Sequence, residues 1–213
     1  MKQRGKVKCL VMAAILAACL PALAGANLIQ NGGFEAPVVY PAWFDTYWSG
    51  VEPSGFMWSV GIASVDQIGS LWRGASNTEG DQSVDIDYDA TLSQSFNTTP
   101  GMQYYVKFYY SHNYGWPSAT GYVTVMGAGP TPLLSDTMVH SIPNTYDDMK
   151  FTLYTGNFTA DSVSTTLTFQ GDYNNGLYGF VVDAVEANPV PLPGALALAG
   201  SGLAGMIFWR RRG

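Results

Sequence analysis

Residues 100–110 read PGMQYYVKFYY, a Pro-Gly turn signal followed by nine residues in which aromatic side chains predominate. Aromatic residues suit the pleated, half-buried surface of a sheet, so residues 102–110 predict a long β-strand. Before it, residues 84–89 read VDIDYD and alternate apolar with acidic side chains. A period of two predicts a second strand with one apolar face and one acidic face, and we interpret the acidic face as solvated.

The pattern continues through residues 27–188, where Gly, Pro and Asn turn signals separate short strand-like runs. No sustained 3.6-residue periodicity interrupts them, so helices are not expected. The further predicted strands are residues 122–126, 151–154, 165–170 and 180–185. Many short strands without helices predict an all-β domain, a jelly roll or another β-sandwich.

Charge is distributed unevenly along the 213 residues. Seven of the ten Lys and Arg residues lie at the two ends, whereas all sixteen Asp and Glu residues lie between them. Only Arg73, Lys107 and Lys150 accompany these acids, which leaves the body with a formal charge of −13. Because binding to phosphates or to anionic lipid needs clustered cations, the composition excludes a nucleic-acid role and charge-driven membrane binding.

Residues 1–26 have the layout of a signal peptide. Four cations in the first eight residues precede the apolar run CLVMAAILAACL at 9–20, and small residues flank the cleavage site expected after Ala26. The run is shorter than the roughly 17–25 residues that a spanning helix needs. A lipoprotein signal that would lipidate Cys19 is the alternative. Both cysteines lie in this segment, so no disulfide is expected in the mature body.

Residues 189–213 form a second tag. The motif Val190-Pro191-Leu192-Pro193 precedes an apolar stretch that ends at Trp209, and Arg210, Arg211 and Arg212 follow. Twenty uncharged residues are enough to cross about 30 Å of hydrocarbon, so we predict a transmembrane helix whose arginines stay in the cytoplasm.

This tripartite tail resembles the PEP-CTERM sorting signal of Gram-negative bacteria in its Val-Pro-Leu-Pro variant. The resemblance implies export as a transient inner-membrane precursor that signal peptidase and exosortase process. It further implies delivery to the exopolysaccharide matrix or the cell surface. A permanent C-terminal anchor would need the same residues and is the alternative.

The body carries a second resemblance. Residues 27–35 (NLIQNGGFE) look like the opening strand of galactose-binding-like sandwiches. Residues 64–72, 80–104 and 182–185 follow in an order similar to the bacterial choice-of-anchor C family and its plant cell-wall relatives. The resemblance implies a galactose-binding-like jelly roll. Residues 112–150 have no counterpart in it, so no binding loop is carried over.

Catalytic signatures are missing from the sequence. No G-x-S-x-G elbow occurs, and His112 and His140 are too far apart in sequence for a typical zinc-ligand spacing. We expect His112 in a surface loop and His140 on a strand face. Sixteen acids always supply carboxylate pairs, so these pairs do not single out a glycosidase. We predict a protein that is not an enzyme.

Two sets of acids are candidates for binding a metal. Asp85, Asp87 and Asp89 have EF-hand spacing, but Ala90 and Phe96 replace the required Gly and Glu, so the loop is rejected. The resemblance instead implies that Glu35 and Asp183 meet and, with backbone carbonyls, hold a structural Ca²⁺. The alternative is that each carboxylate caps its local backbone.

Aromatic residues on loops are the candidate sugar-binding groups, because the apolar faces of sugar rings stack on aromatic rings. We select Trp48 and Trp58 from the aromatic segment 43–58, and Tyr114 and Trp116 from the segment after the long strand. The predicted function is non-catalytic binding of extracellular polysaccharide. A matrix or surface protein without a sugar site is the main alternative, and a glycan hydrolase is a distant third.

Overall fold

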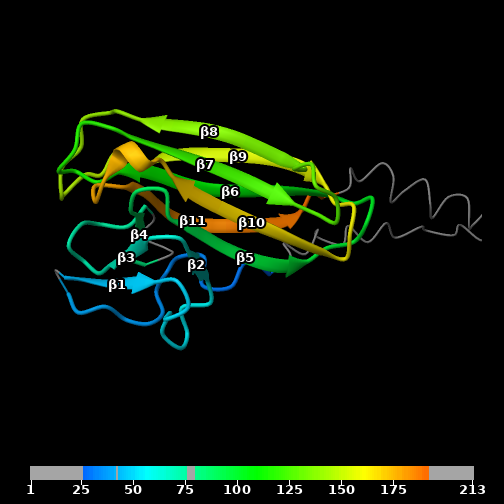
Figure 1. Ribbon diagram of the computed structural model, residues 1–213, viewed down its shortest axis with the longest axis horizontal. Coiled ribbons are helices and arrows are strands. Elements are labelled where there is room, and N and C mark those ends of the chain that lie inside the picture. Colours follow the sequence, from blue (N-terminus) through cyan, green and yellow to red (C-terminus); the bar gives the residue numbers. More distant parts are fainter. Residues whose placement is uncertain (1–25, 42, 76–79, 192–213) are drawn as a thin grey trace, which may run out of the picture.

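The computed structural model describes residues 26–41, 43–75 and 80–191. In these residues the chain forms two antiparallel β-sheets and one short 3₁₀ turn, which confirms the all-β sandwich (Figure 1). The elements are β1 (Phe44–Trp48), β2 (Ser59–Gly61), β3 (Ser64–Ile68), β4 (Ser83–Ile86), β5 (Thr91–Asn97), β6 (Gln103–His112), β7 (Ala119–Met126), β8 (Leu134–His140), β9 (Thr152–Thr159), β10 (Ser164–Gly171), η1 (Tyr173–Asn175) and β11 (Phe180–Pro189).

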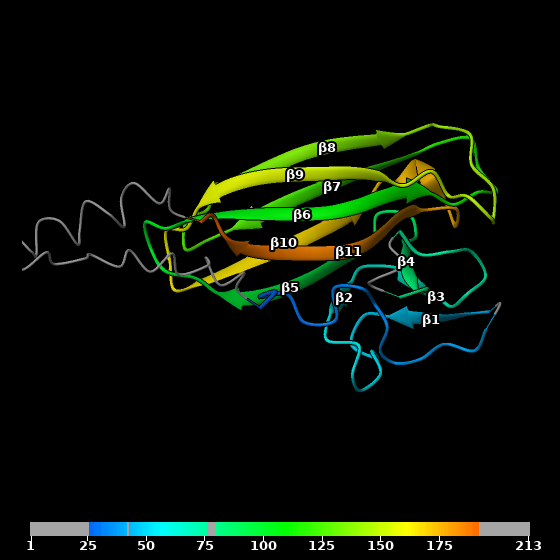
Figure 2. The same ribbon diagram turned by 180° about the vertical axis from the view of Figure 1, so that it is seen from behind.

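The two sheets interleave in sequence. One has six strands in the order β1-β3-β4-β11-β6-β9, and the other has five in the order β2-β5-β10-β7-β8. The reverse view shows β6, β9 and β11 layered in front of β7 and β10, while β1, β3 and β4 extend the six-stranded sheet beyond them (Figure 2). The six-stranded sheet therefore has one face against the partner sheet and one outer face.

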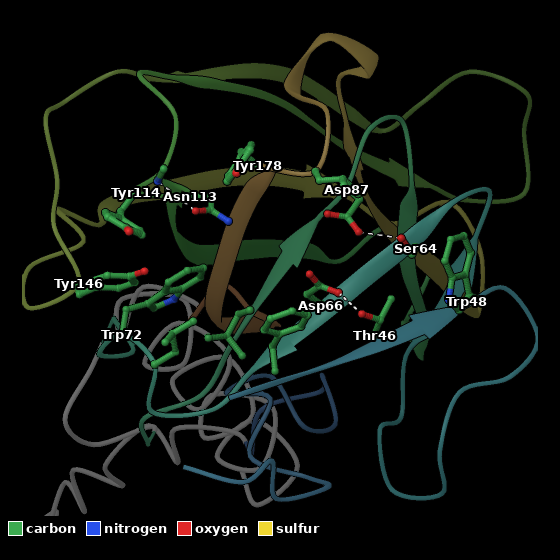
Figure 3. Close-up of a pocket in the computed structure, with 15 residues that line it drawn as sticks. Thr46, Trp48, Ser64, Asp66, Trp72, Asp87, Asn113, Tyr114, Tyr146 and Tyr178 are labelled. Atoms are coloured by element: carbon green, nitrogen blue, oxygen red, sulfur yellow. Dashed lines mark hydrogen bonds between the residues drawn. The ribbon is translucent and has the colours of Figure 1, made fainter. Parts of the chain in front are cut away.

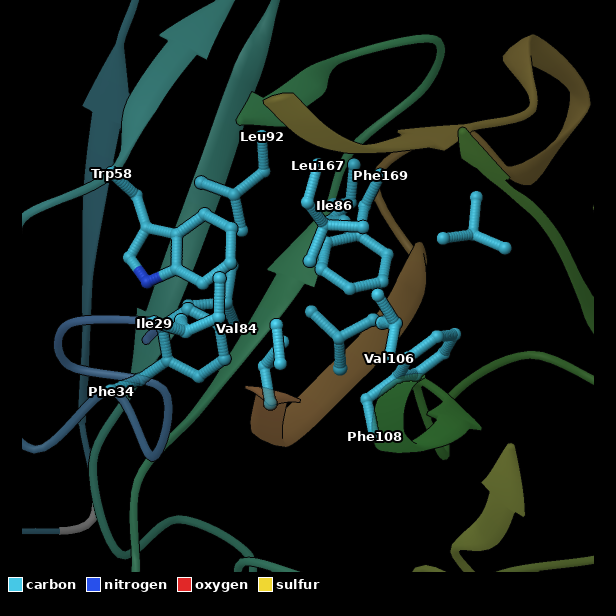
Figure 4. Packing of buried hydrophobic residues seen from close by; sticks show 14 of the residues in the cluster. Ile29, Phe34, Trp58, Val84, Ile86, Leu92, Val106, Phe108, Leu167 and Phe169 are labelled. Atoms are coloured by element: carbon cyan, nitrogen blue, oxygen red, sulfur yellow. The ribbon is translucent and has the colours of Figure 1, made fainter. Parts of the chain in front are cut away.

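The core lies between the sheets, and strand alternation explains which side chains enter it. In β6, Tyr104, Val106 and Phe108 point inward and are buried, while the residues between them are more exposed. Phe169 from β10 meets Phe108 edge-to-face, with ring centroids 4.7 Å apart, and lies 6.0 Å from the ring of Trp58 (Figure 4). The aromatic run at residues 102–110 thus supplies the centre of the core, as its composition predicts.

Strand β11 crosses the middle of the six-stranded sheet and carries a β-bulge. Its register against β6 shifts between Asp183 and Glu186, and Ala184 adopts a positive φ of 51°. Val182 before the bulge and Val185 after it both join the core. Asp183 follows Val182 and therefore points away from the core by ordinary alternation, whereas the bulge returns Val185 to the core.

Residues 27–35 do not form the opening strand that the resemblance implied. They form turns that run beside β11, where Leu28 N–H donates to the Ala187 carbonyl and Val185 N–H donates to the Gly32 carbonyl. The Asn27 side chain bonds the other backbone groups of these two β11 residues: it accepts from the Ala187 N–H and donates to the Val185 carbonyl. Side-chain and turn hydrogen bonds replace a regular ladder, but the expected proximity to β11 is present.

The two described chain ends lie at the same end of the sandwich. Leu28 is bonded to Ala187, and Pro189 pairs with Tyr104 near the start of β6. No helix in the described residues is long and apolar enough to cross a membrane. The predicted signal peptide and transmembrane helix lie outside those residues, as do Leu192, Pro193 and the three terminal arginines. Val190 continues from β11 and donates its N–H to the Gln103 carbonyl.

Candidate functional site

A cavity of about 570 Å³ opens on the outer face of the six-stranded sheet. Strands β1 and β3 line it together with five connecting segments, namely those after β3, after β4, after β6, between β8 and β9, and before β11 (Figure 3). We call this cavity the sheet groove. Its lining residues are Phe44, Thr46, Trp48, Ser64, Asp66, Ile68, Leu71, Trp72, Asp87, Asn113, Tyr114, Gly115, Tyr146, Leu177 and Tyr178.

Aromatic rings form the walls of the sheet groove. Trp48 projects from β1 and is 57% exposed, and Tyr114 after β6 is 40% exposed. Tyr114 lies against Tyr146 with ring centroids 3.7 Å apart, and Trp116 stacks on Tyr178 at 5.5 Å with nearly parallel planes. Trp116 does not itself line the groove but supports the wall that Tyr178 forms.

Two aspartates from neighbouring strands lie on one side of the groove (Figure 3). Asp66 on β3 accepts a hydrogen bond from the Thr46 hydroxyl at 2.6 Å, and Asp87 just after β4 accepts one from the Ser64 hydroxyl at 2.7 Å. Burial raises the pKa of Asp66, and burial together with the nearby Asp66 raises the pKa of Asp87 to about 7. Near neutral pH, Asp87 is therefore only partly ionised.

The prediction that the acidic face of residues 84–89 is solvated is wrong for its first two aspartates. Asp85 is fully buried, and Asp87 is 1% exposed. Val84 and Ile86 face the core, so the aspartates face outward, but the loops over the outer face of the sheet cover them. Asn113 donates to Asp85 Oδ2 at 2.6 Å, while burial and the charges of Asp87 and Asp66 raise the pKa of Asp85 well above its usual value.

Of the four predicted sugar-binding aromatics, Trp58 requires correction. It is 3% exposed, packs against Phe34 and Phe169 in the core, and donates its indole N–H to the Asn31 carbonyl at 3.1 Å. A ring buried between the sheets cannot stack on a sugar. The structure brings Trp48 and Tyr114 to the sheet groove, and it places Trp116 behind the wall.

Of the two histidines, His112 differs from expectation, whereas His140 lies on a strand as predicted. His112 ends β6 and is buried, not in a surface loop, while His140 ends β8 and is buried beside it. Their Nδ1 atoms are 2.6 Å apart, and His140 Nε2 lies 2.8 Å from the Lys150 carbonyl. Because that carbonyl only accepts, His140 carries its proton on Nε2, and the Nδ1–H of His112 donates to His140 Nδ1. Burial lowers the pKa of both rings.

Glu35 and Asp183 lie on either side of one loop. Asp183 Oδ2 accepts from the Ala75 N–H at 2.6 Å, and Glu35 Oε1 accepts from the Gln82 N–H at 2.7 Å. Gly80 lies so close to Glu35 that a Cβ there would be 2.0 Å from the Glu35 carboxyl carbon. A Cβ on Gly74 would be 2.9 Å from both Asp183 Oδ2 and the Gly80 carbonyl oxygen.

This arrangement provides hard oxygen donors, two carboxylates and a backbone carbonyl, around a loop that only glycines fit. Burial raises the pKa of Glu35, and the neighbouring Asp81 adds to the effect. In the described part of the chain no group of three or more acidic, His or Cys side chains forms a metal cluster. A metal here would therefore depend on backbone oxygens as well as on the two side chains.

Most of the chain matches one known protein family. The profile of a family described as "Protein of unknown function (DUF642)" matches residues 27–188. The chain belongs to the DUF642 family. A PEP-CTERM protein-sorting motif matches residues 189–212 of this DUF642 protein, which marks it as an exported protein of Gram-negative bacteria. The sorting signal is therefore confirmed.

One relative of this DUF642 protein is halomucin from Haloquadratum walsbyi. The two are 31% identical over an alignment of 167 residues. This alignment covers 75% of this chain but only 2% of halomucin. This likeness is thus to a small segment of a very large protein.

Two solved structures share the fold of the DUF642 body. TmCBM61, solved in complex with β-1,4-galactotriose, superposes with a TM-score of 0.50 at 13% identity, covering 78% of this chain and all of that one. The arabinose-bound α-L-arabinofuranosidase MgGH51 superposes with a TM-score of 0.51 at 11% identity, covering 78% of this chain and 27% of that one. At these identities the likeness establishes the β-sandwich and nothing further.

Several residues of the sheet groove were not selected from the sequence, chiefly Asp66, Asp87, Tyr146 and Tyr178. Tyr146 and Tyr178 lie 32 residues apart in irregular segments whose approach no local pattern reveals. The alternation of residues 84–89 does indicate that Asp87 points away from the core. An aspartate on that outer face is buried only where loops cover the face. Recognising it needs the loop positions, which only the fold supplies.

Proposed function

We propose that this DUF642 protein binds an extracellular polysaccharide in the sheet groove without catalysing a reaction on it. The observation that carries the proposal is the groove itself, whose aromatic walls enclose aspartate, serine, threonine and asparagine side chains on the outer face of a sheet. Aromatic rings stack on the apolar faces of sugars, and the polar groups can accept or donate to their hydroxyls. The fold shared with TmCBM61, which was solved with a galactotriose, supports this proposal.

The position of the groove relative to the sorting tail also supports it. Pro189 pairs with Tyr104 near the start of β6, whereas Asn113 and Tyr114 follow the end of the same strand. A ten-residue strand is about 30 Å long, so the tail leaves the sandwich at the end far from the groove. We propose that the tail directs the protein to the cell surface or the exopolysaccharide matrix, with the groove facing outward after signal peptidase and exosortase have acted.

Removing one wall of the groove should weaken glycan binding without unfolding the protein. We expect Trp48→Ala and Tyr178→Ala each to weaken retention on the producing organism's matrix polysaccharide about five- to tenfold, since one stacking contact is worth roughly 1 kcal/mol. Affinity electrophoresis or calorimetry measures the loss. Tyr40→Ala is the matched control, because this tyrosine is 80% exposed and lies outside the groove lining.

The outcome separates the competing functions. Equal retention of the Trp48→Ala, Tyr178→Ala and Tyr40→Ala proteins would favour a structural matrix protein without a sugar site. Release of reducing ends from the polysaccharide would favour a hydrolase. Melting temperatures of the three variants within a few degrees of the unchanged chain show that a lost affinity reflects the groove.

We further propose that Glu35 and Asp183, with the Gly80 carbonyl, hold a structural Ca²⁺ that fastens residues 74–75 and 80–82 to β11 and to the N-terminal segment. A cation there would offset the repulsion among Glu35, Asp81 and Asp183. In chelator the melting temperature should fall by about 5–10 °C, because a ligand at 100 times its dissociation constant stabilises by about 2.7 kcal/mol.

Scanning calorimetry with EGTA, followed by re-addition of Ca²⁺, tests the metal site. Glu35→Gln should melt at one temperature in both conditions, since it lacks a ligand. A melting curve of the unchanged protein that EGTA does not shift would instead assign both carboxylates to backbone capping.

A further inference from the structure

The floor of the sheet groove gathers negative charge without a counter-ion. Asp66 and Asp87 line it. Asp85 does not line it but accepts a hydrogen bond from Asn113, which does. No Lys, Arg or His is among the lining residues. Lys107 and Lys150 are engaged with Glu186 and Asp148, away from the groove. Arg73, the third cation in the part of the chain that the structure describes, is exposed and is not among the lining residues either.

The carboxyl groups are also incompletely satisfied. Asp85 Oδ1 and Asp87 Oδ1 are buried and have no hydrogen-bond partner in the described residues, although each residue's other oxygen is bonded. In Figure 3 the oxygen of Asp87 that is not bonded to Ser64 points to the side of the groove on which Asn113 and Tyr178 lie. A buried acceptor without a partner costs free energy, so this position favours a ligand that donates to it.

Burial raises the pKa of all three carboxyl groups in the free protein, and repulsion by neighbouring aspartates adds to the effect on Asp85 and Asp87. With a pKa of about 7, Asp87 keeps part of its protons near neutral pH, which lowers the negative charge of the groove. A positively charged donor would favour the ionised form and would take the place of those protons. A negatively charged ligand would meet the same carboxyl groups with unfavourable charge.

We propose that the sheet groove recognises an amino-sugar unit of its polysaccharide, with a free ammonium group bound by Asp87 and Asp66 and the sugar ring held between the aromatic walls. The inference rests on the proposed glycan-binding function and adds the substrate class. Ammonium supplies three donors in a compact group, which suits two carboxylates on adjacent strands. By the same argument the groove discriminates against uronate- and sulfate-bearing glycans.

The test compares three oligosaccharides of equal length by calorimetry at pH 7 and low salt: a β-1,4-linked glucosamine hexamer, its fully N-acetylated form and a galacturonate hexamer. The purified protein should bind the glucosamine hexamer at least tenfold more tightly than the acetylated form, and the galacturonate most weakly. This ratio is what one or two charge-assisted hydrogen bonds supply. Asp87→Asn and Asp66→Asn should each reduce the preference about tenfold and leave affinity for the acetylated hexamer within threefold.

Asp45→Asn is the matched control, since Asp45 lies on β1 between groove-lining residues but points to the other face, and it should keep the full preference. If one aspartate variant fails to fold, the other still carries the test, because each contacts a different hydroxyl partner. Tight binding of the acetylated hexamer without an amino-sugar preference would overturn this inference and leave the polysaccharide-binding function standing. Failure of all three hexamers and of the matrix polysaccharide to bind would overturn both.

Discussion

Replacing Phe169 with alanine should lower the free energy of unfolding by about 3–5 kcal/mol, the usual cost of deleting a buried phenyl ring. Phe169 is fully buried on β10 and contacts Phe108 from the opposite sheet and Trp58 from the segment before β2. Among the described aromatic contacts, no other ring contacts both Phe108 and Trp58. The cavity would therefore open where the two sheets meet, and urea unfolding followed by tryptophan fluorescence measures the loss.

Tyr173→Ala is the matched control, because it removes a ring of similar size from a side chain that is 70% exposed on η1. Because the ring contacts only Tyr88 among the described aromatic pairs, its removal should cost no more than about 1 kcal/mol. A Phe169→Ala protein as stable as the Tyr173→Ala protein would show that the two sheets do not depend on this ring for their packing.

Acidification should destabilise the protein through the buried histidine pair. In the neutral state His112 donates to His140 Nδ1, and His140 donates to the Lys150 carbonyl. Protonating His140 places a second donor between the two rings, and the bond between them is lost. Burial lowers the pKa of both histidines in the folded state, so the unfolded chain, with pKa values near 6.5, takes up protons first.

Because the unfolded chain binds more protons than the folded protein in this pH range, the free energy of unfolding falls as the pH falls. The stabilisation by the neutral pair is complete above about pH 6.5 and is lost as pH falls toward the lowered pKa values, by up to about 1.4 kcal/mol per pH unit for each histidine. The raised pKa values of Asp66, Asp85 and Asp87 have the opposite effect, since these groups lower stability as pH rises. Comparison with a variant therefore isolates the histidine contribution.

Urea unfolding of the unchanged protein and of His140→Gln at pH 5 to 8 provides that comparison. The variant should be less stable at pH 8, and the gap between the two proteins should narrow as pH falls below 6.5. Parallel stability curves across this range would contradict the assignment of the pair as a neutral donor and acceptor.

Local patterns predicted much of the sandwich because strands depend on alternation that is visible in the chain. The runs at 102–110, 122–126 and 165–170 lie in or across observed strands, and the run at 84–89 begins in β4 but extends three residues beyond its end at Ile86. The segment 27–35 departed because its backbone bonds are satisfied by Asn27 and by turns, so no regular ladder is needed. Strand β8, with four exposed residues among its seven, carried too little apolar signal to be selected.

The candidate site was predicted less completely. Trp48 and Tyr114 were found because both lie in aromatic-rich segments outside the predicted strands, although the structure places Trp48 on β1. Trp58 has the same local appearance but is buried, since the segment before β2 folds between the sheets. Composition cannot separate an aromatic ring that covers the core from one that faces solvent, because both bury apolar area when the loop settles.

The sequence alone determined the C-terminal sorting signal, the acidic body and the all-β class, because charge, short motifs and two-residue alternation are properties of consecutive residues. Only the tertiary structure decided which groups meet: the aspartates of adjacent strands under covering loops, the two histidines 28 residues apart, and the two carboxylates flanking residues 74–75 and 80–82. Those contacts arise from strand order and loop closure between distant segments. Burial then changes the chemistry of groups whose identity the sequence had already displayed.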